Sequence, residues 1–93
     1  AEYFDEFNML WSDESPINVK EGRLIAIAVS AAIRCEYCIA AQIEFAKKDG
    51  ANEEEIKAAI QIAAEIQRFS TLLYGNEFDV EAFNKIIGRD NKE

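Results

Sequence analysis

The sequence of 93 residues contains no histidine, one proline and only two cysteines. Histidine is the commonest general base and metal ligand in proteins. Its absence excludes Ser-His-Asp and Cys-His nucleophile arrangements and His-ligated zinc or haem for this sequence, also in a homo-oligomer. Structural zinc needs four ligands, so two thiols suffice only if two copies share a site, which is a minor alternative. We therefore expect no metal and no cofactor, and a chemistry based on thiols, carboxylates, lysine, arginine or tyrosine.

Basic residues are also few, with 10 lysines and arginines against 18 acidic residues and a net charge of −8. Nucleic acids and anionic lipid surfaces bind clustered lysine and arginine, so neither is an expected partner. Long hydrophobic runs are absent too, because the longest, Leu24 to Ile33, is half of what a membrane-spanning helix requires. No basic segment leads into an apolar stretch with a cleavage site, so we expect no signal peptide and a cytoplasmic location.

Apolar residues make up 49% of the sequence, enough for a core, and we expect a single domain over residues 1–93. No segment alternates between apolar and polar residues, whereas apolar residues recur at helical spacing, for example Phe4, Phe7 and Trp11. The predicted fold class is therefore all-α, with about five helices. After a first helix over 2–11, we expect helices over about 19–33, 35–48, 53–74 and 80–87, with Asn18, Asn52 and Asp79 as N-caps and Gly50, Gly75 and Gly88 at their ends.

Two of these helices carry more apolar surface than one small chain can cover. Residues 24–33 are apolar around the whole helix, and the helix over 53–74 has two apolar rows, whereas a surface helix has one stripe. Exposed apolar patches of this size usually mark an interface. We expect a homo-oligomer built on these two helices. The alternative is a compact five-helix monomer that wraps residues 24–33 at its centre.

The segment Cys35-Glu36-Tyr37-Cys38 is a CxxC motif. At helical spacing the two sulfurs lie on one face, one turn apart, close enough to form a disulfide with small adjustment. Cys35 falls where a helix is expected to begin, where free N–H groups and the helix dipole lower the pKa of a thiol and Arg34 adds positive charge. A thiolate attacks peroxides and disulfides, so the motif favours redox chemistry over two simple core cysteines. Tyr37 is expected to pack rather than to act as an acid.

Two stretches of the sequence together resemble a known family. Residues 24–42 read LIAIAVSAAIRCEYCIAAQ, and residues 50–60 read GANEEEIKAAI. They resemble the alkylhydroperoxidase AhpD-like members of the carboxymuconolactone decarboxylase family, and the resemblance covers about residues 17–75. It implies an all-helical fold that assembles as trimers or hexamers.

The resemblance also implies an activity, namely a peroxiredoxin-type antioxidant reaction with the CxxC motif as the redox centre and a peroxide as the substrate. In the peroxidase members the second cysteine, here Cys38, is the peroxidatic thiol that becomes a sulfenic acid. The first, here Cys35, donates a proton and then resolves the sulfenic acid to a disulfide. An external thiol, in some members a lipoyl group on a partner protein, restores the dithiol.

Two positions depart from the family pattern. Gln42 stands four residues after the second cysteine, where the family has a histidine, and Arg23 stands twelve residues before the first, where it has a glutamate. Gln42 can donate a hydrogen bond to a thiolate but cannot take a proton. Arg23 could lower the thiol pKa by its charge if it reaches the sulfurs. Both are candidate supporting residues. General acid–base catalysis typically raises a reaction rate about 10²–10⁴-fold, so an enzyme without it would be slow.

Three functions therefore remain open for this sequence. The first is a thiol-dependent peroxidase or thiol–disulfide oxidoreductase that uses Cys38 and Cys35. The second is a non-catalytic oligomeric scaffold or small-molecule binding module that has lost the proton relay. A decarboxylase-like activity on a small carboxylic acid ranks last, because its acid–base histidine is absent.

Overall fold

The computed structural model describes residues 7–89, and these contain helices and no strand, which confirms the predicted all-α class. Phe4 and the start of the first expected helix lie outside the described residues. No helix within residues 7–89 is long and apolar enough to cross a membrane. Residues 7–10 are helical, and they are followed by α2 (Val19–Ile33), α3 (Glu36–Lys48), α4 (Glu53–Gly75) and α5 (Val80–Ile86).

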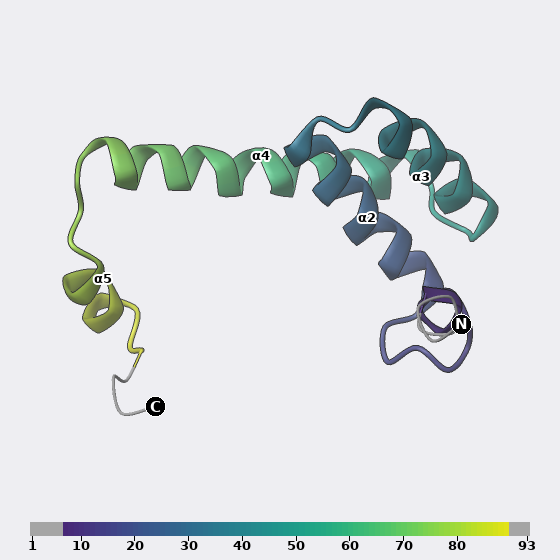
Figure 1. Cartoon of the computed structure of the whole chain (residues 1–93), viewed down its shortest axis with the longest axis horizontal. Helices are drawn as coiled ribbons and strands as arrows, with labels where there is room; N and C mark the ends of the chain where they lie inside the picture. Colours follow the sequence, from purple (N-terminus) through teal and green to yellow (C-terminus); the bar gives the residue numbers. More distant parts are fainter. Residues whose placement is uncertain (1–6, 90–93) are drawn as a thin grey trace.

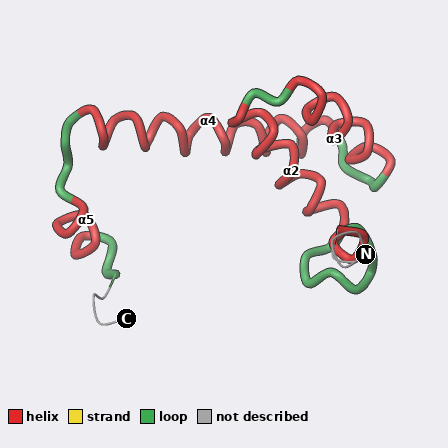
Figure 2. Tube along the Cα trace, in the orientation of Figure 1, coloured by secondary structure: helices red, strands yellow, loops and turns green. Residues whose placement is uncertain are grey.

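The helices form one packed body and one projecting arm (Figure 1). In the body, α3 and the first half of α4 both pack against α2. The second half of α4 runs on beyond α2, and α5 lies at its far end after a short loop (Figure 2). Phe83 of α5 packs against Phe69 of α4, with the ring centroids 5.8 Å apart. We call α5 and the second half of α4 the arm.

The helix starts follow the capping chemistry that the sequence predicts. The Asn18 side chain accepts a hydrogen bond from the Glu21 N–H at 2.8 Å and caps α2. Asn52 and Glu55 form a complete capping box at the start of α4, since each side chain accepts a bond from the other's N–H. Asp79 caps α5 in the same way as Asn18 caps α2. These local bonds pair N–H groups that the first helical turn leaves without partners.

A small core joins the three helices of the body. Ile27 of α2 and Ala46 of α3 are fully buried, and Ala51 and Ile56 pack on them. Gly50 has a φ of 100°, in the left-handed region that favours glycine, and it turns the chain after α3. This turn brings Ala51 and the start of α4 back against α2.

One ion pair ties the start of α2 to the start of α4. The Lys20 Nζ lies 2.8 Å from the Glu55 Oε2. The hydrogen bond from Lys20, followed by the bond from the Asn52 N–H, holds the pKa of the Glu55 carboxyl below its ordinary value of 4.5. Glu55 thus completes the cap of its own helix and joins that helix to α2.

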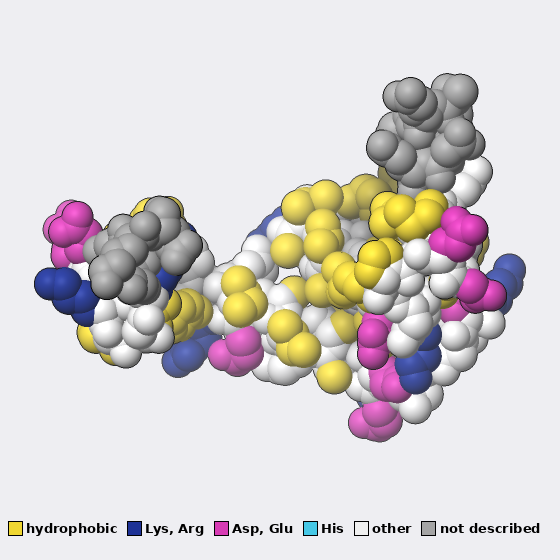
Figure 3. Space-filling model, turned by 90° about the horizontal axis from the view of Figure 1, so that it is seen from below, with side chains coloured by type: hydrophobic (Ala, Val, Ile, Leu, Met, Phe, Trp, Pro, Cys, Tyr) yellow, Lys and Arg dark blue, Asp and Glu magenta, His cyan; other side chains and the backbone are white. Residues whose placement is uncertain are grey.

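A single chain leaves most of its large apolar side chains exposed. Eighteen of them within residues 7–89 are exposed, whereas Ile27 is the one large side chain there that is fully buried. Hydrophobic side chains gather in the middle of the face seen in Figure 3. The single chain therefore does not wrap α2 at its centre, as the compact-monomer alternative requires. Half or more of each side chain is exposed in one row on α2 and in one row on α4, namely Ile25, Val29 and Ile33, and Ile62, Ile66 and Phe69.

Candidate functional site

The connection between α2 and α3 places the thiol pair. Arg34 adopts the left-handed conformation with a φ of 61°, and its N–H donates to the Ala31 carbonyl at 3.2 Å. The Cys35 N–H donates to the Ser30 carbonyl at 3.0 Å. These two bonds form the Schellman arrangement that ends many helices. Arg34 is therefore the one residue between the end of α2 and Cys35, which is the N-cap residue of α3.

Cys35 and Cys38 are joined by a disulfide, with their Cα atoms 5.2 Å apart. Cys38 is the third residue of α3, and its N–H donates to the Cys35 Sγ at 3.2 Å. The prediction that Cys35 begins a helix and that the two sulfurs lie close together is confirmed. An N–H at a helix N-terminus stabilises negative charge, so this arrangement stabilises the charge that develops on the Cys35 sulfur when Cys35 gives up its proton or leaves the opened disulfide.

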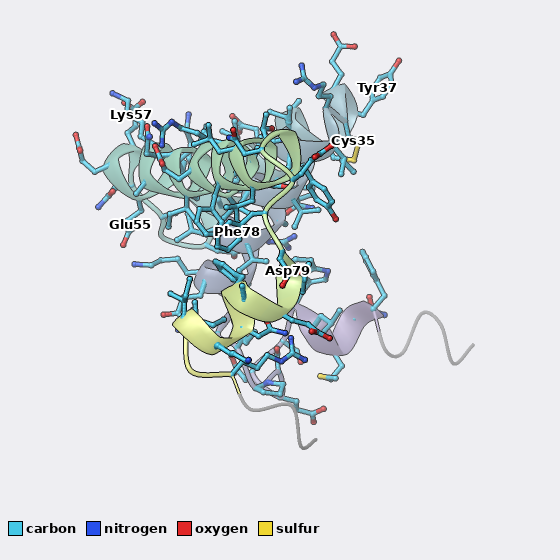
Figure 4. All side chains as sticks on the ribbon, turned by 90° about the vertical axis from the view of Figure 1, so that its left-hand side faces the viewer. Cys35, Tyr37, Glu55, Lys57, Phe78 and Asp79 are labelled. Atoms are coloured by element: carbon cyan, nitrogen blue, oxygen red, sulfur yellow. A yellow bond between two sulfur atoms is a disulfide. The ribbon has the colours of Figure 1, made fainter. Side chains whose placement is uncertain are left out.

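The disulfide lies at an accessible surface of the molecule. Both cysteines are partly exposed, and Tyr37 between them is 87% exposed. The Tyr37 side chain points away from the body of the protein (Figure 4). The expectation that Tyr37 packs is therefore wrong for the single chain. A partner molecule can approach the sulfurs from the side on which Tyr37 projects.

The structure brings together the two residues that depart from the family pattern. The Arg23 Nη1 donates to the Gln42 Oε1 at 3.1 Å, and the Arg23 Nε donates to the Asp49 Oδ2 at 2.9 Å. The guanidinium also lies 3.8 Å from the centroid of the Trp11 ring and 4.8 Å from that of Phe45. The Arg23 side chain is only 14% exposed. Arg23 is thus held between α2, α3 and the segment before α2.

The hydrogen bonds of Arg23 within residues 7–89 end on Asp49 and Gln42, and neither Arg23 nor Gln42 bonds a sulfur there. Gln42 lies four residues after Cys38, on the same face of α3. An arginine can only donate, so the Gln42 atom that faces it is Oε1, and the Gln42 Nε2 is left for another acceptor. The sequence reasoning missed this contact. Arg23 and Gln42 occupy the two positions at which the family has a glutamate and a histidine. Their side chains can hydrogen-bond each other, and this was the sign of the contact in the sequence.

Trp11 covers Arg23 from the segment that precedes α2. A Cβ atom on Gly22 would lie 3.3 Å from the Trp11 Cζ3, so the glycine lets the ring lie close to α2. Phe7 meets Trp11 edge-on, with the ring centroids 6.3 Å apart. The aromatic ring therefore shields the guanidinium from water and strengthens its contacts.

No group of three or more cysteine, aspartate or glutamate side chains within residues 7–89 is arranged to hold a metal ion. The chemical groups at this site are the two sulfurs, the α3 N-terminus and the Arg23–Gln42 pair.

Comparison with known proteins finds one matching family and a related protein. The sequence profile of the carboxymuconolactone decarboxylase family matches residues 1–77. A protein of Paracoccus denitrificans described as "Uncharacterized protein 4 in cox locus" is 30% identical over 64 residues. The match spans 69% of this chain and 58% of that relative's length. No solved structure matches the chain. The family resemblance carried by residues 24–42 and 50–60 is confirmed.

Proposed function

Because the chain belongs to the carboxymuconolactone decarboxylase family, we propose that it is a thiol-dependent oxidoreductase of the peroxidase type. The observation that carries this proposal is the Cys35–Cys38 pair at the accessible start of α3, with a helix N–H directed at the Cys35 sulfur. A pair of sulfurs that can bond each other, and whose reduced form is stabilised by a helix N-terminus, has the properties of a redox couple.

In the proposed oxidation, the Cys38 thiolate attacks one oxygen of a peroxide. The S–O bond forms, the O–O bond breaks, and the leaving oxygen takes a proton from Cys35 to give an alcohol or water. The Cys35 thiolate then attacks the sulfur of the Cys38 sulfenic acid and displaces hydroxide, which is protonated to water. The two electrons that reduce the peroxide come from the two thiols, which end as the disulfide.

Gln42 and Arg23 have supporting roles in this proposal. With its Oε1 held by Arg23, Gln42 can direct its Nε2 donor at the Cys38 thiolate, which lies one turn away on α3. Arg23 is then a positioning residue, since Asp49 and Trp11 hold its guanidinium in place. Neither residue accepts a proton at neutral pH. We therefore propose a slow reaction, without the general base that usually contributes about 10²–10⁴-fold.

In the return step an external thiol attacks Cys38, and Cys35 leaves as a thiolate. The N–H of Cys38 stabilises that leaving thiolate. A second thiol, or the second thiol of a lipoyl-type dithiol, then attacks the mixed disulfide and restores the Cys38 thiol. A cytoplasmic location, where disulfides are kept reduced, is part of the same proposal.

We further propose that the protein is a homo-oligomer in which neighbouring copies cover the exposed rows of α2 and α4. Val29 and Ile66 are central in these rows and are 53% and 62% exposed in the single chain. A trimer or hexamer is the assembly that the family resemblance implies. In sedimentation velocity, Val29→Glu and Ile66→Glu should each dissociate the oligomer, because a buried carboxylate at an apolar interface is costly. A wild-type protein that sediments as a monomer at all concentrations contradicts this part.

A non-catalytic scaffold or binding module is the second candidate, and one observation favours it. The relay positions are occupied by an Arg23–Gln42 pair that bridges α2 and α3, which is a structural arrangement. In this view the disulfide is a structural link at the start of α3. The two candidates differ in how fast the reduced pair reacts.

Oxidation of the reduced protein by stoichiometric hydrogen peroxide, with a sulfenic-acid trap and mass spectrometry, separates the two candidates. The Cys35→Ser variant should accumulate a trapped adduct on Cys38, because no thiol resolves it. The matched Cys38→Ser variant should give little adduct on Cys35. If the wild-type thiols are oxidised no faster than a free small thiol, the peroxidase proposal fails and the scaffold candidate stands.

A further inference from the structure

A second feature lies at the turn that precedes the CxxC motif, namely a hollow of about 450 Å³ with two arginines in its wall. Arg34 comes from the turn that joins α2 to α3, and Arg68 comes from α4. Among the described residues, the wall includes Thr71 with a hydroxyl and Gln67 with an amide, but no aspartate or glutamate. Its residues are Arg34, Ala64, Gln67, Arg68, Thr71 and Leu72.

The two arginines make no ion pair within the described chain. The ion pairs there are Lys20–Glu55 and the pair that Arg23 makes. With a net charge of −8, the sequence supplies many carboxylates, and none of those within residues 7–89 lines this hollow. Two arginines in one wall that make no ion pair among the described residues favour an anionic ligand there. Guanidinium groups bind carboxylates through two parallel hydrogen bonds, which makes a carboxylate the fitting ligand.

The backbone at Arg34 adds a second reason to assign a ligand to this hollow. Arg34 holds a φ of 61° at the end of α2. Glycine or asparagine usually occupies this left-handed position, because a Cβ atom there crowds the backbone. A long charged side chain is thus kept at a strained position immediately before the redox pair. Strain of this kind is characteristic of functional positions.

The wall of the hollow that α4 supplies also stays open in the oligomer that we propose. Arg68 is two residues from Ile66, which is about 200° around the helix. A neighbouring copy that covers the apolar row of α4 therefore contacts the opposite side of that helix.

We propose that this hollow binds the carboxylate of a low-molecular-weight thiol that reduces the Cys35–Cys38 disulfide. The inference rests on the proposed redox function and names the substrate class of its return step. Arg34 and Cys35 are adjacent residues, so a carboxylate held by the guanidinium brings the thiol of the same small molecule to the disulfide.

The return step that this site would promote is balanced with two molecules of the thiol. The first thiolate attacks the Cys38 sulfur, forms a mixed disulfide and releases the Cys35 thiolate, which takes a proton. The second thiolate attacks the ligand sulfur of the mixed disulfide and releases the Cys38 thiolate, which also takes a proton. Two thiols are oxidised to one small disulfide, and the protein disulfide is reduced to two thiols.

The test measures how fast three thiols of different charge reduce the full-length disulfide protein. The probes are mercaptosuccinate, 2-mercaptoethanol and cysteamine, and each rate is divided by the rate of the same thiol with a neutral small-molecule disulfide. The net charge of −8 alone predicts that the cationic thiol reacts fastest and the anionic thiol slowest. The hollow predicts the reverse order, with the anionic thiol fastest and its advantage lost at high salt.

Variants assign the effect to the hollow. Arg34→Asn, which suits the left-handed backbone, and Arg68→Gln should each lower the mercaptosuccinate rate about threefold, as expected for one solvent-exposed ion pair. The double variant should lower it about tenfold, and Arg68→Lys should keep part of the effect. The rate with 2-mercaptoethanol should not change in Arg68→Gln, and in Arg34→Asn the mercaptosuccinate rate should fall relative to the 2-mercaptoethanol rate. Arg89→Gln is the matched control, because it removes one positive charge just after α5, outside the hollow.

Two results would overturn the anion site and leave the redox function standing. One is a normalised rate for mercaptosuccinate that is no higher than that for 2-mercaptoethanol. The other is an Arg89→Gln effect as large as those of Arg34→Asn and Arg68→Gln, since the net charge would then explain the preference. By contrast, a disulfide that none of the three thiols reduces would overturn the redox function itself, and the anion site would fall with it.

Discussion

Replacing Arg23 with methionine removes the guanidinium and keeps an unbranched apolar stem in its place. The variant loses the Asp49 ion pair, which is worth about 1 kcal/mol at a partly exposed site. It also loses a charge-assisted hydrogen bond to Gln42, worth about 1.5 kcal/mol, and the contact with the Trp11 ring, worth about 0.5–1 kcal/mol. Because the three contacts share one group and are not additive, we expect the free energy of unfolding to fall by about 2–3 kcal/mol.

Urea unfolding of the oxidised protein at one fixed concentration measures this loss, since an oligomer makes stability depend on concentration. With a slope of about 1 kcal/mol per molar urea for a chain of this size, the midpoint should fall by about 2–3 M. Trp11 is the single tryptophan of the sequence, so its fluorescence reports the same site locally. Far-UV circular dichroism follows the helices.

Arg89→Met is the matched control, because Arg89 is exposed and makes no ion pair within residues 7–89. Its midpoint should stay within the equivalent of about 0.5 kcal/mol of wild type. Arg23→Lys should lie between the two, since an ammonium keeps the charge but lacks the planar fork. If Arg23→Met unfolds at the same midpoint as Arg89→Met, the argument that Arg23 holds α2, α3 and the Trp11 segment together is refuted.

Three further predictions concern the site, the capping box of α4 and the core. Gln42→His places a base one turn from Cys38 and should raise the rate of peroxide oxidation of the reduced pair at least about tenfold. The rate is measured by stopped-flow thiol titration, and an unchanged rate would show that residue 42 does not reach the sulfur. Because the pKa of the Glu55 carboxyl is lowered in the folded protein, its contribution to stability is complete above pH 4.5 and is lost as the pH falls through the folded value. Thermal unfolding between pH 6 and pH 3 should therefore show a smaller acid loss for Glu55→Gln than for wild type, and equal losses would contradict the assignment. Ile27→Ala empties the fully buried centre of the body and should cost about 2–5 kcal/mol in urea unfolding, and a loss below about 1 kcal/mol would mean that the core is not where we place it.

The helix boundaries could be predicted from the sequence because they depend on local chemistry. Asn18, Asn52 and Asp79 each accept a hydrogen bond from the N–H three residues further along the chain. Their capping role can therefore be recognised from residues that are close in the sequence. The start of α3 at the CxxC motif could be placed for the same reason, since Cys35 bonds the Cys38 N–H. The CxxC spacing identified the pair as a redox candidate, and the family resemblance supplied the separate roles of Cys38 and Cys35.

The contacts between helices could not be predicted in the same way. The Arg23–Gln42 bond joins residues 19 apart in the chain and depends on how α2 and α3 cross. The convergence of Arg34 and Arg68 on one hollow depends on where α4 passes the end of α2. The exposure of Tyr37 depends on which elements pack around the start of α3. In each case the sequence shows which residue types are present. Which residue each of them contacts depends on how the helices pack against one another.

The reduction potential of the Cys35–Cys38 pair decides whether this pair is a redox couple or a structural disulfide. It is obtained by equilibrating the protein in thiol–disulfide buffers at pH 7 and counting the free thiols by mass spectrometry. The helix N–H on the Cys35 sulfur stabilises the reduced form, so the account predicts a potential between about −270 and −120 mV, the range of thiol–disulfide oxidoreductases. A potential below about −300 mV, the range of structural disulfides, would contradict the claim that this pair is a redox couple.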